Sequence, residues 1–255
     1  MPQSGQHTDH RPVTWLAIDL RAGEGIPLHD HAHGQLIYSA QGIIQVEGQR
    51  NAWIVPPERA VWVPPELPHR IGNRAAAQLR TLYVSADSAR RLPNDCQVLW
   101  VTPFLRELIL SLVSRAPIYE PGSATDRLAQ VALDEVAIAG AVPYRLPLPD
   151  DPRLRSLVDA LLENPGDARS VVHWARACGM SVRTLARVFK QEMGMGFAAW
   201  RQQARLMTAI AQLSEGARVT DVALDLGYEN PSAFIAMFKR TLGETPGRFV
   251  KKPRG

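Results

Sequence analysis

The chain has 255 residues, of which 45% are apolar and 21% charged, a composition typical of a globular protein of one or two domains. Its two cysteines are too few and too far apart for a disulfide scaffold or a cysteine-based zinc site, and no apolar run is long enough to cross a membrane. The N-terminus lacks the apolar core of a signal peptide, so we expect a cytoplasmic protein that does not bind membranes.

The formal charge of +4 is unevenly distributed along the chain. Residues 1–150 carry 13 Arg and no Lys against 15 Asp and Glu, whereas residues 151–255 carry 16 Lys and Arg against 10 Asp and Glu. A positive surface is what binding to phosphate groups requires, so nucleic-acid binding is expected of the second half.

The first half begins with a polar segment and continues with β-type sequence. Residues 1–12 are short of apolar side chains, and we expect a disordered arm there. Residues 13–85 hold short β-type runs separated by Gly, Pro and Asn, which is typical of a sandwich or barrel. The runs are W-L-A-I-D-L, Q-L-I-Y-S-A, I-I-Q-V-E, A-W-I-V, V-W-V and L-R-T-L-Y-V.

Two histidine-containing stretches lie within this region. The first is H-D-H-A-H-G-Q-L-I-Y-S-A-Q-G at residues 29–42, and the second is W-I-V-P-P-E-R-A-V-W-V-P-P-E-L-P-H-R-I-G-N at residues 53–73. They resemble the two halves of the cupin signature, which implies a β-barrel of the double-stranded β-helix type. The matching positions are His29, His31, Gly42, Pro64, His69 and Asn73, while Gln35 replaces the usual Glu and Glu66 stands where the signature prefers Gly.

The histidines are candidate ligands for a divalent transition metal. On a strand, His29 and His31 would point to one face, and His69 would approach from another strand. Three imidazoles suit such an ion, although Gln35 removes the anionic ligand that hard cations need most. The alternative is a small-molecule or structural pocket in which the histidines only form hydrogen bonds. Neither interpretation predicts catalysis.

Residues 86–139 are expected to form a connector followed by two amphipathic helices. Apolar side chains recur at helical spacing at Phe104, Leu105, Leu108, Ile109, Leu112 and Val113, and again at Leu128, Val131, Ala132 and Val136. These helices either pack the barrel against a second subunit, giving a homodimer, or cover the barrel's own open face. Residues 140–152 contain four prolines and no helical periodicity, which indicates a semi-rigid linker.

The region 153–255 contains one pattern twice. In each copy a short helix runs into a glycine, Gly179 or Gly227, and a second helix with a polar face follows. This arrangement predicts an all-α domain with two helix-turn-helix units in tandem. The side chains expected to face outward from the two second helices, and therefore to contact DNA, are Arg183, Thr184, Ala186, Arg187, Lys190, Ser232, Ala233, Ala236, Lys239 and Arg240.

Residues 168–250 resemble the DNA-binding domain of AraC/XylS-family transcription regulators. The resemblance rests on W-A-R-A-C-G-M-S-V-R-T-L-A-R-V-F-K and on V-T-D-V-A-L-D-L-G-Y-E-N-P-S-A-F-I-A-M-F-K-R-T-L-G-E-T-P-G-R-F. It implies a sequence-specific regulator whose cupin senses a small molecule or metal ion, with recognition helices entering successive major-groove segments about 34 Å apart. The implied partners are double-stranded promoter or operator DNA, a second copy of the chain and, for an activator, RNA polymerase.

Two other functions are compatible with the same residues. One is a metal-dependent cupin enzyme fused to a DNA-binding domain, which is disfavoured because Gln35 replaces Glu and no nucleophile lies near the histidines. The other is a DNA-binding protein that needs no effector. We expect no enzymatic activity.

Overall fold

The computed structural model describes residues 11–57, 59–73, 75–142 and 144–251, so most of the expected arm at residues 1–12 lies outside the described residues. The chain separates into two compact units. The first comprises Met1–Gly48 and Trp53–Arg145, and the second comprises Gln49–Ala52 and Leu146–Gly255. Among the described helices, none is long and apolar enough to span a lipid bilayer.

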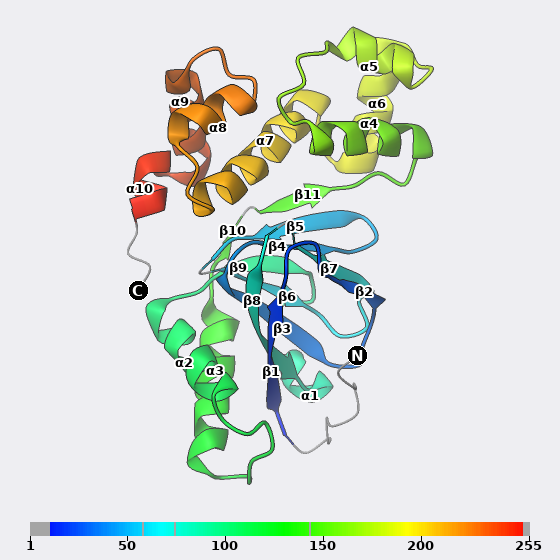
Figure 1. Ribbon diagram of the computed structural model, residues 1–255. Coiled ribbons are helices and arrows are strands. Elements are labelled where there is room, and N and C mark those ends of the chain that lie inside the picture. Colours follow the sequence, from blue (N-terminus) through cyan, green and yellow to red (C-terminus); the bar gives the residue numbers. More distant parts are fainter. Residues whose placement is uncertain (1–10, 58, 74, 143, 252–255) are drawn as a thin grey trace. The chain divides into compact units, whose positions relative to one another are not determined.

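The strands form two sheets, as the β-type runs predicted (Figure 1). The six-stranded sheet has the order β1-β8-β3-β6-β9-β10, and the five-stranded sheet has the order β11-β5-β4-β7-β2. The strands are β1 (Val13–Leu20), β2 (Ile26–His29), β3 (Gly34–Gln41), β4 (Ile44–Glu47), β5 (Asn51–Val55), β6 (Arg59–Val63), β7 (His69–Gly72), β8 (Ala77–Val84), β9 (Gln97–Trp100), β10 (Ala141–Val142) and β11 (Arg145–Pro147).

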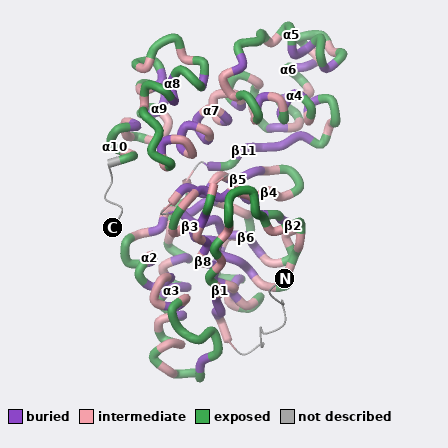
Figure 2. Tube along the Cα trace, in the orientation of Figure 1, coloured by how far each residue is buried: buried purple, intermediate pink, exposed green. Residues whose placement is uncertain are grey.

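Strands β3 and β6 are buried along almost their whole length, because both of their faces are covered. Leu36, Tyr38 and Trp62 belong to one apolar cluster with the helices α2 (Pro103–Val113) and α3 (Ala124–Ile138). The alternate residues face the other way, as the antiparallel register places Gln35 opposite Tyr83 and Ile37 opposite Thr81. Figure 2 shows the buried positions concentrated in the strands of this unit.

The two amphipathic helices thus cover a sheet of their own unit. Their buried side chains are Leu105, Leu108, Ile109 and Leu112 on α2 and Ala129, Ala132, Leu133 and Val136 on α3. Phe104 and Val131, which also fit the helical spacing, are instead exposed at 55% and 39%. The apolar stripe of each helix is therefore wider than the part that this sheet covers.

Segments expected to be irregular contain regular elements. The connector holds α1 (Ala86–Ala89) and β9, and β9 pairs with β6. The proline-rich segment 140–152 holds β10 and β11. The strands expected for His29 and His69 are β2 and β7, which the β-type runs do not include. All of these strands have four residues or fewer, too short to show alternation, so their pairing partners rather than their own sequence define them.

The second unit is helical. Its helices are α4 (Pro152–Glu163), α5 (Val171–Ala177), α6 (Val182–Met193), α7 (Phe197–Ser214), α8 (Val219–Asp225), α9 (Pro231–Leu242) and α10 (Pro246–Lys251). Ser170, Ser181 and Asn230 cap α5, α6 and α9 by accepting hydrogen bonds from the third residue beyond. The pairs α5–α6 and α8–α9 are the two predicted helix-turn-helix units.

Helix α7 runs from the first pair to the second (Figure 1). Trp200, Ala204, Met207 and Ile210 are buried along it, and the indole Nε1 of Trp200 donates to the carbonyl oxygen of Pro147 at 2.8 Å. Its contacts with α4, α6, α8 and α10 make it the centre of this unit's core.

The two turn glycines differ in their surroundings, although both adopt the left-handed conformation, with φ of 64° at Gly179 and 73° at Gly227. A β-carbon at Gly179 would meet nothing within 4 Å, whereas one at Gly227 would lie 2.6 Å from the carbonyl oxygen of Gly166. The loop around Gly166 is also held by Arg205, whose Nε donates to the Pro165 oxygen at 2.9 Å. This loop and the second turn therefore touch backbone to backbone.

Candidate metal centre and candidate nucleic-acid interface

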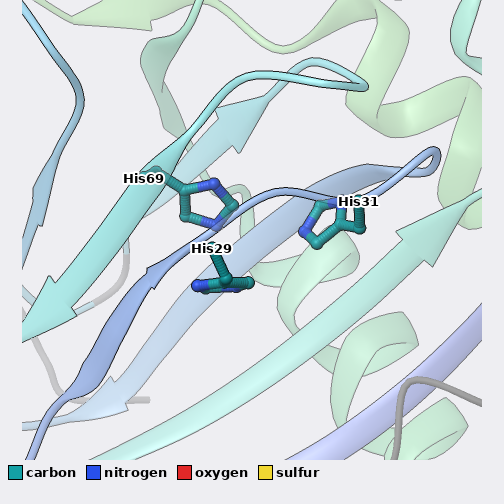
Figure 3. Close-up of side chains that lie close together, drawn as sticks. All are labelled: His29, His31 and His69. Atoms are coloured by element: carbon teal, nitrogen blue, oxygen red, sulfur yellow. The ribbon is translucent and has the colours of Figure 1, made fainter.

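The three predicted histidines come together in the first unit (Figure 3). His29 at the end of β2 is paired in register with His69 at the start of β7, and their ring centroids are 4.4 Å apart. His31 lies in the irregular segment between β2 and β3 rather than on the strand, and the backbone N–H of Glu66 donates to its carbonyl oxygen at 2.8 Å. One ring nitrogen from each histidine lies within 4.8 Å of the others.

The unexpected Glu66 occupies a strained position. It is the only described residue other than glycine with a positive φ, at 61°, which explains why the signature prefers Gly there. The hydrogen bond to His31 accompanies this conformation and links the two histidine-bearing segments.

The tautomer of all three rings follows from their backbone contacts. The Nδ1 atoms of His29, His31 and His69 lie 2.8, 2.6 and 2.8 Å from the carbonyl oxygens of Pro27, His33 and Leu67. A carbonyl can only accept, so each Nδ1 carries the proton and each Nε2 of a neutral ring keeps its lone pair. Histidines that bind metals show the same arrangement, with the non-ligating nitrogen donating to a carbonyl or carboxylate.

Gln35 is the fourth group of this cluster. It is 2% exposed, its Oε1 lies 3.0 Å from Nε2 of both His31 and His69, and its Nε2 donates to the Thr81 hydroxyl at 2.9 Å. In the reversed amide orientation the NH₂ group would donate to both imidazoles, and the Thr81 hydroxyl, which donates to the carbonyl oxygen of Leu36 at 3.1 Å, would have to turn its proton to the amide oxygen. The same amide can therefore pair with two metal-free rings or offer its oxygen to a cation.

Burial adjusts the protonation of one ring. His69 is fully buried, and this desolvation is the main cause that lowers its pKa from 6.5 to about 4, with the hydrogen bond to Leu67 acting in the opposite direction. His69 is therefore neutral at pH 7, as a metal ligand must be.

Two residues of β8 complete the surroundings of the histidines and were not found from the sequence. Thr81 orients Gln35, and the ring of Tyr83 meets that of His31 edge to face at 5.8 Å. Alternation along β8 would have placed Thr81 and Tyr83 on one face, but which residues they oppose depends on the β3–β8 register, which the sequence does not reveal.

Helix α6 presents a cationic face. Arg183, Ala186, Arg187 and Lys190 are exposed and Thr184 is half-buried, while the opposite side buries Leu185, Phe189 and Met193. Gln191, which sequence reasoning missed, accepts a 3.0 Å hydrogen bond from Arg187 one turn earlier. Val182, in the first turn of this helix, is 40% exposed.

Helix α9 presents a face that is nearly free of polar groups until its last turn. Ser232, Ala233, Ala236, Lys239 and Arg240 are exposed, and Phe234, Met237 and Phe238 are buried beneath them. The two helices thus expose the predicted side chains, but with very different chemistry.

The chain matches known proteins along nearly its whole length. Residues 16–165 match the AraC-like ligand binding domain family, and residues 174–252 match a helix-turn-helix domain family. The chain is 38% identical to the HTH-type transcriptional regulator NimR of Escherichia coli (strain K12) over 252 residues, which cover 98% of this chain and 92% of NimR. It is 33% identical over 104 residues to the HTH-type transcriptional regulator RipA of Corynebacterium glutamicum, covering 41% of this chain and 31% of RipA. The crystal structure of the DNA-binding domain of AdpA in complex with a target DNA aligns at 28% identity and a TM-score of 0.38, covering 42% of this chain and all of that one.

Proposed function

Because the chain belongs to the AraC family of helix-turn-helix transcription regulators, we propose that its first unit senses a divalent transition metal and its second unit reads an operator sequence. Membership of this family makes it a DNA-binding regulator rather than an enzyme. The metal proposal rests on the hydrogen bonds of the three imidazoles. Each Nδ1 donates to a backbone carbonyl oxygen, so the three Nε2 lone pairs are available to an ion.

The donor set favours a particular class of ion. The available donors are imidazole nitrogens of three histidines and the amide oxygen of Gln35, and no carboxylate belongs to the described cluster. Imidazole suits nickel, copper, zinc and iron, whereas magnesium and calcium require hard oxygen ligands and usually carboxylates. A bound ion would supply a positive centre joining the two histidine-bearing segments, with coordination positions left for a small ligand.

In DNA binding, we assign most of the polar base recognition to α6. Arg183 and Arg187 can donate to guanine edges, while Ala233 and Ala236 on α9 can only make apolar contacts such as those with thymine methyl groups. Lys239 and Arg240, at the end of α9, supply charge for phosphates. Base preference should therefore depend more on α6 than on α9.

Two substitutions test this division after the operator has been selected from a random DNA pool. Arg187→Ala should weaken operator binding about 10- to 100-fold and relax the preference at one base pair, since a bidentate contact with guanine contributes about 1–3 kcal/mol. Ala236→Ser should change the preference much less. Gel shifts on base-substituted operators measure both, and a larger loss of preference with Ala236→Ser would show that the assignment is reversed.

We also propose a homodimer formed through the helices of the first unit. Phe104 on α2 and Val131 and Ile138 on α3 are exposed at 55%, 39% and 77%, a level of apolar exposure that a second subunit would reduce. Val131→Asp should raise the dissociation constant at least tenfold in sedimentation equilibrium. Ile118→Asp, at an exposed apolar position in the loop after α2, is the matched control. A parent protein that sediments as a monomer would disprove the proposal.

A further inference from the structure

The second unit contains a groove of about 550 Å³ between α7 and α9. The α7 side carries Arg201, Gln202 and Arg205, and the α9 side carries Ala233, Ala236 and Arg240. Three guanidinium groups therefore line it, and none of the described residues lining it is a carboxylate. The groove carries an excess of positive charge that nothing in its own walls balances.

Arg201 is the most constrained of these cations. It is half-buried, its Nη1 donates to the carbonyl oxygen of Arg169 at 3.3 Å, and its Nε is buried with no hydrogen-bond partner among the described residues. Burial is the main cause that lowers the pKa of its guanidinium, and the charge of Arg205 one turn away acts in the same direction. Asp167 is near enough to oppose this, but its carboxylate already accepts from Arg169 at 2.6 Å.

A cation held in this way is costly in the free protein. A partly desolvated charge loses hydration, and a like charge on the next turn adds repulsion. An anion entering the groove would offset both costs.

We propose that the groove receives a phosphate of the DNA backbone, with Arg201 as its principal cation and Arg240 at the opposite wall. This inference rests on the proposed DNA-binding function, because the Ala233 and Ala236 wall is the outward face of α9. The site positions the second unit on DNA and carries no sequence information.

The test compares the salt dependence of operator binding for the parent, Arg201→Gln and Arg201→Lys. Losing one phosphate contact should reduce the slope of log K against log salt by about 0.9, which corresponds to about fivefold weaker binding near 0.15 M salt. For Arg201→Gln this loss should be equal on operator and unrelated DNA, unlike the selective loss expected for Arg187→Ala. Arg201→Lys keeps the charge and should keep the slope, which separates loss of charge from loss of structure.

Arg90→Gln removes the same charge from an exposed position in the first unit and should leave the slope unchanged. An unchanged slope in Arg201→Gln, with the parent still binding its operator, would overturn the phosphate site and leave the proposed function standing. A parent that binds no DNA would overturn both.

A further experiment adds inorganic phosphate at constant ionic strength. It tests whether the groove binds a phosphate of the DNA backbone or only a free anion from solution. Under the proposal, phosphate protects the parent against thermal unfolding more than it protects Arg201→Gln, and the two proteins also differ in the slope of DNA binding against salt. If it stabilises only the parent while the DNA slope is the same in both, the groove binds a free anion and the DNA assignment is wrong.

Discussion

Replacing Gly227 by alanine should destabilise the second unit by about 2–4 kcal/mol, whereas the same change at Gly179 should cost about 1 kcal/mol. Both glycines have left-handed backbone conformations, so both variants incur the conformational cost of a β-carbon there. Only at Gly227 would the new carbon also lie 2.6 Å from a backbone oxygen, that of Gly166, and 3.2 Å from a nitrogen of Arg205. A backbone oxygen cannot move aside as a flexible side chain can. The difference between the two free-energy costs therefore measures the effect of the close contact at Gly227.

Urea unfolding followed by the helical circular dichroism signal at 222 nm provides this comparison. The two positions are equivalent in the tandem repeat, which makes Gly179→Ala a matched control for the turn conformation. We further expect Gly227→Ala to lose operator affinity, because the turn sets the position of α9. Equal costs at the two sites would mean that the loop at Gly166 adjusts freely.

Nickel or zinc should raise the melting temperature of the parent protein, and His31→Ala should abolish the rise. Binding to the folded state alone stabilises it by RT ln(1 + [L]/Kd), which is about 2.7 kcal/mol when the free metal concentration is 100 times Kd. Magnesium should have no effect, since the cluster offers neutral donors. The measurement is thermal unfolding of the full chain after treatment with a chelator and addition of each ion.

His173→Ala is the control, since it removes an exposed imidazole from α5 and leaves the cluster intact. If the histidines only hydrogen-bond within the pocket, His31→Ala will lower the stability of the metal-free protein and added metal will shift neither protein. An equal shift in parent and His31→Ala would place the metal elsewhere.

The sequence predicted the helical unit much better than the sheets. Several of the helices combine an apolar period with a recognisable beginning, such as Ser181 before α6 or Asn230 with Pro231 before α9, and these signals are local. Strand β9 has no such local signal, because its pairing with β6 comes from a distant part of the chain. Phe104 and Val131 fit the helical period but are exposed, because the period does not reveal how much of a stripe is covered.

The candidate metal centre was predictable in its members but not in its arrangement. The spacing of His29 and His31 and the position of His69 within a matching motif were sufficient to group them. The orientation of the Gln35 amide toward Thr81 depends on strand register, and the groove at Arg201 depends on how α7 and α9 pack. The spacing of apolar side chains within one segment does not predict contacts between elements that are far apart in the sequence.

The hydrogen bonds that orient the three imidazoles have a consequence for how this pocket could diversify. Each ring is anchored to a carbonyl only two residues away, at Pro27, His33 and Leu67, so no distant side chain is needed to aim it. Neighbours such as Tyr83 can then change by mutation without releasing the rings. A lineage of regulators could in this way acquire new signals around an inherited set of ligands, retaining the coordinating atoms while the rest of the cavity drifts.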